Sequence, residues 1–212
     1  MCRRLLCYGD SNTYGYDPRS YLGGRYPESV RWTALLNTGD WKVINKGENG
    51  RSIPRRDQEI RAAANAIHLS KAEVVVVMLG SNDLLQCPSL SAEVCGERME
   101  RFLSVVLTQT QGKAKILLVA PPPMVPGAWV SDPRTVEESR KLAGCYETTA
   151  HRLGIAFADA GVWGVELAYD GVHFSEKGHL AFAKGIQIAL DSLLRTDKRQ
   201  SIRYAKLIPC GI

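Results

Sequence analysis

Two short runs of the chain are almost entirely apolar, and they constrain the fold more than any other feature of the sequence. Residues 73–79 and 115–120 consist mostly of Val, Leu, Ile and Met, without the polar alternation of a half-exposed strand. Strands of this kind are usually buried on both faces, as in a parallel sheet covered by helices. Weaker runs at residues 4–8, 42–45 and 154–159 bring the expected number of strands to five.

The segments between these runs have the spacing of helices. Apolar side chains recur every three or four residues within 53–70, 90–110, 135–153 and 175–194. Asp132 before Pro133 marks a helix start, Thr135 with Glu138 has the pattern of a capping box, and Ser175 precedes the last helix. Alternating strands and helices predict a three-layer α/β/α sandwich, flavodoxin-like, around a five-stranded parallel sheet.

The length and charge of the chain fit a single globular domain. The chain has 212 residues, of which 45% are hydrophobic and 23% charged, which excludes a disordered or fibrous protein. We expect the domain to cover residues 1–195 and the polar residues from 196 to 212 to form a C-terminal tail. The net charge of +5 is mild and no nucleic-acid-binding module is recognisable, so we expect no nucleic-acid partner.

The sequence also bears on location and on metals. No apolar run approaches the ~18 residues of a membrane span, and the start of the chain lacks a signal-peptide pattern. The six cysteines form no Cys-x-x-Cys pair, so we expect free thiols in a cytoplasmic protein that does not bind membranes. His68, His151 and His179 lie in helical segments, where surface or hydrogen-bonded positions are expected rather than metal ligation. We expect neither a metal ion nor an organic cofactor.

Four small polar clusters follow strands or precede the last helix. They occupy residues 9–12, 47–52, 80–83 and 170–173. In open parallel sheets, ligands bind beyond the carboxyl ends of the strands. The sequence therefore predicts one site, to which all four clusters contribute, at this edge of the sheet.

The residue types in these clusters are those of nucleophilic catalysis. Ser11 is the candidate nucleophile, and a serine hydroxyl needs an adjacent base, which His173 can supply. Asp170 can orient the imidazole and stabilise its charged form. The Ser11 N–H, the Gly50 N–H and the Asn82 side chain are candidate donors to an oxyanion. Each cluster alone is typical of a turn or a helix cap, but the ordered set indicates a serine hydrolase.

At these residues the chain resembles the SGNH hydrolases, also called the GDSL esterase/lipase family. The family is named for four invariant residues, which here correspond to Ser11, Gly50, Asn82 and His173, with Asp170 completing the triad. The resemblance covers about residues 3–195.

Longer strings bring the resemblance closer to the bacterial arylesterase/acyltransferase branch of that family. They lie at residues 8–16, 31–32, 78–83, 121–123, 159–161 and 170–174. Members of the branch hydrolyse small acyl esters, some transfer the acyl group to alcohols, and some form large homo-oligomers. The resemblance therefore implies a small-molecule acyl ester as substrate and a homo-oligomer.

Other positions bear on the substrate. Asn12 follows the serine where the namesake string has Leu; this position varies, and we expect no effect on the chemistry. We expect Asp10, Asn12 and Trp129 to contact substrate, and residues 21–27 and 126–132 to shape its site.

Several activities remain open within this interpretation. We expect hydrolysis of esters through an acyl-enzyme, and we expect short, acetyl-type acyl chains because no apolar lid segment is present. Transfer of the acyl group to an alcohol is a second expected outcome. A carbohydrate O-acetylesterase is an alternative, since aromatic rings can stack on a sugar; the candidates are Tyr14, Tyr16, Tyr21 and Trp129. A thioesterase or a lysophospholipase of the same family is another. A non-catalytic module that binds a small ligand at the same edge is the alternative from a different class.

Overall fold

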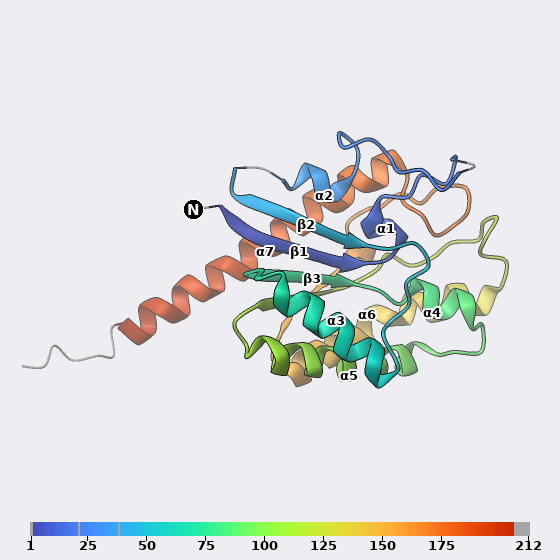
Figure 1. Ribbon diagram of the computed structural model, residues 1–212. Coiled ribbons are helices and arrows are strands. Elements are labelled where there is room, and N and C mark those ends of the chain that lie inside the picture. The colour runs from blue at the N-terminus through green and yellow to red at the C-terminus, as the bar shows by residue number, and fades with distance from the viewer. Residues whose placement is uncertain (1, 21, 38, 206–212) are drawn as a thin grey trace, which may run out of the picture.

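One parallel sheet forms the centre of the molecule (Figure 1). The computed structural model describes residues 2–20, 22–37 and 39–205, with side chains described up to residue 195. The strands are β1 (Arg3–Gly9), β2 (Trp41–Gly47), β3 (Val74–Met78), β4 (Lys115–Ala120) and β5 (Ala156–Asp159). They pair in the order β2-β1-β3-β4-β5, and every pair is parallel. The predicted five-stranded parallel sheet is confirmed.

Helices cover both faces of this sheet. One face packs against α3 (Asp57–Leu69), α5 (Ala92–Thr110) and α6 (Pro133–Leu153), and the other against α2 (Trp32–Leu35) and α7 (Glu176–Ala205). Successive side chains of a strand point to opposite faces. Val75 and Val77 therefore enter the first core, whereas Val74 and Val76 pack with Phe182 in the second. Both faces of β3 are buried, as its apolar sequence predicts, and the three-layer architecture is confirmed.

Short helices directly follow two of the central strands, where the sequence suggests only turns. Helix α1 (Ser11–Tyr14) begins two residues after β1 ends, and α4 (Ser81–Gln86) follows β3. A single 3-10 turn, η1 (Ala160–Val162), follows β5. Helices of four to six residues are too short to show a helical period, which explains why the sequence pattern does not reveal them.

The start of α6 confirms one predicted cap and corrects another. The Asp132 side chain accepts a hydrogen bond from the Arg134 N–H at 2.9 Å, so Asp132 is the capping residue. The predicted capping box of Thr135 and Glu138 is wrong, because both residues lie inside the helix. The Glu138 carboxylate instead accepts from the Ala92 N–H at 2.8 Å, and this bond joins α6 to the start of α5.

The last helix runs through the boundary at which we expect the tail to begin. It starts after Ser175, whose hydroxyl accepts a hydrogen bond from the Gly178 N–H at 3.1 Å, as the sequence predicts. Its backbone continues to Ala205 and extends beyond the sheet, away from the carboxyl ends of the strands (Figure 1). Residues 206–212 of the expected tail lie outside the described residues.

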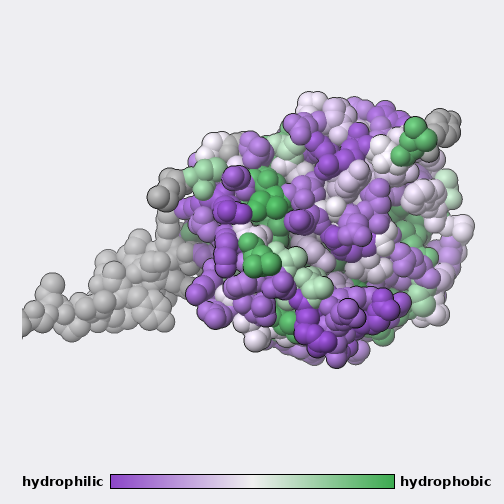
Figure 2. All heavy atoms as spheres, in the orientation of Figure 1, coloured by the Kyte–Doolittle hydropathy of each residue, from purple (hydrophilic) through white to green (hydrophobic). Residues whose placement is uncertain are grey.

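The face of the molecule in Figure 2 is mostly hydrophilic, with hydrophobic side chains in small separate patches. In the described part of the chain, no helix is long and apolar enough to cross a membrane. Over the same residues, no three His, Cys, Asp or Glu side chains are grouped so as to hold a metal ion. Five cysteines are free thiols, as expected, and Cys210 lies outside the described part; the five are Cys2, Cys7, Cys87, Cys95 and Cys145.

His179 is neither exposed nor hydrogen-bonded, contrary to expectation. Its ring is fully buried between Tyr26 and Phe174, with centroids 5.2 and 5.4 Å away. Neither ring nitrogen has a hydrogen-bond partner among the described residues. The pKa of His179 is lowered to about 4, chiefly by burial and also by the positive charge of Arg31, and Asp17 opposes the shift.

This burial predicts a loss of stability in mild acid that His179→Leu removes. The unfolded chain binds a proton at this side chain below pH ~6.5, but the folded chain does so only near pH 4, so unfolding becomes easier as pH falls between the two values. The difference in free energy of unfolding between His179→Leu and the wild type should therefore shift by about 3 kcal/mol in favour of the variant when the pH is lowered from 7 to 4.

Urea unfolding at both pH values measures this difference, with exposed His151→Leu as the control. The comparison between variants is needed because another group acts in the opposite direction. Burial raises the pKa of Asp10 to about 6, so protonation of Asp10 favours the folded state as pH falls. Wild-type and His179→Leu stabilities that change in parallel with pH would contradict the prediction.

Candidate active site

The turn after β1 places Ser11 at the carboxyl edge of the sheet. Asp10 leaves the strand with an extended backbone and caps α1, its side chain accepting from the Asn12 N–H at 2.9 Å. Ser11 is the first residue of the helix, and Gly15 ends the helix in the left-handed conformation. The Ser11 side chain thus stands at the strand-to-helix junction, where it is 7% exposed.

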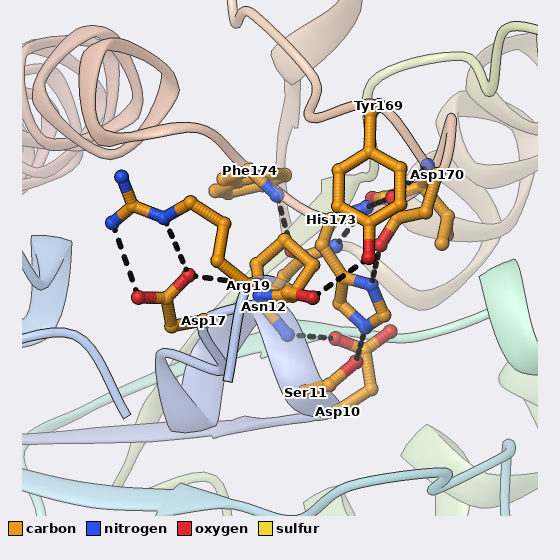
Figure 3. Close-up of polar contacts among 11 residues, drawn as sticks. Asp10, Ser11, Asn12, Asp17, Arg19, Tyr169, Asp170, His173 and Phe174 are labelled. Atoms are coloured by element: carbon orange, nitrogen blue, oxygen red, sulfur yellow. Dashed lines mark hydrogen bonds and ion pairs between the residues drawn. The ribbon is translucent and has the colours of Figure 1, made fainter. Parts of the chain in front are cut away.

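A chain of two hydrogen bonds links Ser11 to the segment before α7 (Figure 3). The Ser11 Oγ lies 2.9 Å from the His173 Nε2, and the His173 Nδ1 lies 2.6 Å from the Asp170 Oδ2. Ser11 and His173 are 162 positions apart in the sequence. All three side chains are buried.

The surroundings of Asp170 favour its ionised form. Burial alone would raise its pKa, but hydrogen bonds from the His173 ring and from two backbone N–H groups outweigh burial and lower the pKa below its usual value. The N–H groups of Val172 and His173 both reach the Asp170 Oδ1 at 3.0 Å. An ionised carboxylate only accepts, so the His173 Nδ1 carries the proton. The Nε2 is then free to accept the proton of the Ser11 hydroxyl.

Two further N–H donors belong to other segments that line the same cleft. Gly50 has a φ of +74°, a left-handed conformation that favours glycine, and its N–H has no hydrogen-bond partner among the described residues. The Asn82 Nδ2 donates one hydrogen bond to the Arg51 carbonyl at 3.1 Å. An amide nitrogen has two hydrogens, so the second remains available. With the Ser11 N–H, this set can stabilise an oxyanion.

Helix α4 holds the loop that carries Gly50, a role that sequence reasoning missed. Three side chains of α4 bind the backbone of residues 50–53: Gln86 the Gly50 carbonyl at 3.1 Å, Asn82 the Arg51 carbonyl, and Asp83 the Ile53 N–H at 2.9 Å. Asp83 also forms an ion pair with Arg98 at 3.0 Å. In the sequence, the one sign of this role is that the acidic residue Asp83 directly follows Asn82 at the end of a strand. These bonds hold the backbone that directly follows the Gly50 N–H.

The loop after β4 packs tightly on the segment that carries Asp170. The Trp129 N–H donates to the Asp170 carbonyl at 3.0 Å. Glycine is required at Gly127, because a Cβ there would lie 2.5 Å from the Asp170 carbonyl carbon. This packing brings the Trp129 ring against His173, with the centroids 4.9 Å apart. The Tyr16 ring, from the segment after α1, also contacts His173, at 4.6 Å.

These segments enclose a cleft of about 340 Å³ around the Ser11–His173 pair. It is lined by Asp10, Ser11, Tyr16, Asn49, Gly50, Ser81, Asn82, Leu85, Trp129, Val172 and His173. Three larger hollows, of about 850, 690 and 440 Å³, contain neither Ser11 nor His173. The hydrogen-bonded side chains, rather than cavity size, therefore identify the candidate site.

The residues expected to contact substrate divide into two groups. Asp10 and Trp129 line the cleft, and Trp129 is 54% exposed. Asn12 does not line the cleft, because both atoms of its amide bind the backbone around His173; its expected substrate contact is corrected. Of the other aromatic candidates, Tyr16 lines the cleft, the Tyr14 ring stacks on the Arg25 guanidinium, and Tyr21 lies outside the described residues.

A Ser–His–Asp chain beside free N–H donors is the arrangement by which serine hydrolases act. Residues 7–181 match the GDSL-like Lipase/Acylhydrolase family, and the chain belongs to this family. It is therefore a carboxylic ester hydrolase, and the resemblance noted in its sequence is confirmed. No match is found among curated protein sequences.

Solved structures of esterases have the same fold. A carbohydrate acetylesterase family member from Sinorhizobium meliloti is 30% identical, with a TM-score of 0.79, over 91% of this chain and 99% of that one. Est24, a carbohydrate acetylesterase from the same organism, is 26% identical, with a TM-score of 0.78, over 90% and 99%. The aryl esterase of M. smegmatis is similar in fold, at 24% identity and a TM-score of 0.72, over 92% and 99%.

Proposed function

We propose that this chain hydrolyses short acyl esters through an acyl-enzyme formed on Ser11. The observation that carries the proposal is the 2.9 Å contact between the Ser11 Oγ and the His173 Nε2, within a cleft that is also lined by the N–H donors Gly50 and Asn82. A buried serine that only supported the fold would not need a histidine oriented by an ionised carboxylate.

The mechanism follows from the protonation states. The His173 Nε2 takes the Ser11 proton as the Ser11 Oγ attacks the ester carbonyl carbon. The carbonyl oxygen becomes negative and is stabilised by the N–H groups of Ser11, Gly50 and Asn82. Asp170 stabilises the imidazolium. The C–O bond then breaks, His173 protonates the departing alcohol, and water attacks the acyl-enzyme by the same steps. An alcohol in place of water gives acyl transfer.

The dimensions of the cleft support a small acyl group. Ligand pockets in proteins span roughly 300–1,000 Å³, so a cleft of about 340 Å³ is at the small end. Leu85 and Val172 supply apolar contacts, whereas Asp10, Asn49 and Ser81 are polar. A long alkyl chain would extend past these residues into solvent.

A carbohydrate acetyl ester is the second candidate substrate, and the aromatic rim favours it. Trp129 is 54% exposed beside Tyr16, with ring centroids 6.2 Å apart. An exposed indole presents a flat apolar face, which suits the C–H face of a sugar ring. The two Sinorhizobium meliloti relatives are named as carbohydrate acetylesterases.

A substrate panel tests the proposal. On p-nitrophenyl esters from acetate to decanoate, kcat/KM should be highest at acetate or butyrate and lower by about tenfold or more at decanoate, because the extra methylenes gain no contacts. Acetylated monosaccharides in the same panel, followed by acetate release, separate the two candidates. A maximum of kcat/KM at decanoate would contradict the short-acyl proposal. A KM for sugar acetates that is not lower than the KM for p-nitrophenyl acetate would remove the second candidate.

A further inference from the structure

Asn12 joins the nucleophile segment to the segment that carries His173 (Figure 3). Its Nδ2 donates to the Val172 carbonyl at 3.0 Å, and its Oδ1 accepts from the Phe174 N–H at 2.9 Å. The two backbone groups belong to the residues immediately before and after His173. One side chain therefore holds the backbone of the histidine from both sides.

The main chain of Asn12 is itself held in place. Its N–H donates to the Asp10 Oδ1 at 2.9 Å, and its carbonyl accepts from the Trp32 Nε1 at 2.8 Å. Trp32 is fully buried and Asn12 is 3% exposed. Because the backbone of Asn12 is fixed, its side-chain amide can hold residues 172–174 in one position.

This bridge bears directly on the distance between Ser11 and His173. The two segments are 160 residues apart in the chain, so their alignment depends on tertiary contacts. Among the described residues, the other hydrogen bond between α1 and this segment is the Ser11–His173 bond itself. A displacement of about 1 Å in reacting groups can cost about 100-fold in rate.

We infer that Asn12 is a positioning residue that sets the His173 imidazole against the Ser11 hydroxyl. The inference rests on the proposed roles of Ser11 and His173. Leucine, the residue of the family's namesake string, is close to asparagine in size but makes neither bond. On this inference, the departure from that string at Asn12 affects the chemistry, whereas the sequence alone led us to expect no effect.

The first test replaces Asn12 by leucine. Asn12→Leu should lower kcat for p-nitrophenyl acetate by about 10- to 100-fold and change KM by less than about twofold, because Asn12 does not line the cleft. The rate of fluorophosphonate labelling of Ser11 should fall by the same factor. Thr13→Val is the matched control: Thr13 lies next to Asn12 in α1, is 1% exposed, and its hydroxyl has no partner among the described residues.

A second background separates positioning from general support of the fold. If Asn12 acts through His173, adding Asn12→Leu to His173→Ala should cause no further loss, because residues that act as a unit are not additive. A further loss of the same size in that background would overturn the inference, as would full activity of Asn12→Leu. Should Asn12→Leu not fold, Asn12→Asp applies: it keeps the acceptor for Phe174, sets an oxygen against the Val172 carbonyl, and should also lower kcat.

The outcomes distinguish this inference from the proposed function. Loss of activity in Ser11→Ala with full activity in Asn12→Leu rejects only the role of Asn12. Full activity in Ser11→Ala rejects the proposed function and the inference together.

Discussion

Ser11→Ala is expected to lower kcat for p-nitrophenyl acetate by about 10⁴- to 10⁶-fold. Alanine has no oxygen that can form the acyl-enzyme, so the two-step route is closed. The cleft and the N–H donors remain, and they can still bind the ester and stabilise an oxyanion formed by water. KM should therefore change much less than kcat. Steady-state kinetics on purified protein measure both constants.

A fluorophosphonate probe gives a second, independent measurement of the same residue. The probe should label the wild type, and mass spectrometry should place the adduct on Ser11, whereas Ser11→Ala should not react. Ser104→Ala is a suitable control, because Ser104 is exposed on α5 and does not line the cleft. Labelling of Ser11→Ala at the wild-type rate would reject the nucleophile. A protein that neither reacts nor hydrolyses esters would favour the non-catalytic binding module.

The grouping of Ser11, Gly50, Asn82 and His173 was predictable from the sequence for a physical reason. Parallel strands all end at the same edge of the sheet, so polar residues that follow several strands converge there. β3 is also predictable, because a strand buried on both faces must be apolar throughout. The apolar runs thus predict the strands of the sheet, and the polar residues that directly follow these runs predict the candidate site.

The roles of Asn12 and His179 were not predictable, because they depend on partners far away in the chain. The amide of Asn12 binds backbone groups about 160 positions later, and no local pattern specifies that pairing. His179 was expected at a surface or hydrogen-bonded position, but its helix turns it between two aromatic rings. Local patterns can also place a helix cap at the wrong residue. Thr135 and Glu138 match a capping box, but the residue that caps α6 is Asp132.

The other large effect is expected for Asp170→Asn, which changes a single oxygen to an NH₂ group. The Asp170 Oδ1 accepts two backbone N–H bonds, from Val172 and His173. In the variant, the amide oxygen will keep these bonds and the NH₂ will take the place of the Oδ2 opposite the His173 Nδ1. An NH₂ donates, so the Nδ1 must become the acceptor and the proton must move to the Nε2. The Nε2 then cannot accept the proton of Ser11.

The expected result is a loss of about 10³- to 10⁴-fold in kcat for p-nitrophenyl acetate with little change in KM, because the cleft keeps its shape. Fluorophosphonate labelling of Ser11 should slow by a similar factor, since it needs the same proton acceptor. Asp159→Asn is the matched control: Asp159 also accepts a backbone N–H, from Gly161 at 2.7 Å, but it lies outside the cleft. Wild-type kinetics in Asp170→Asn would mean that the ionised carboxylate is not needed to orient His173, and would leave Ser11 and His173 acting as a pair.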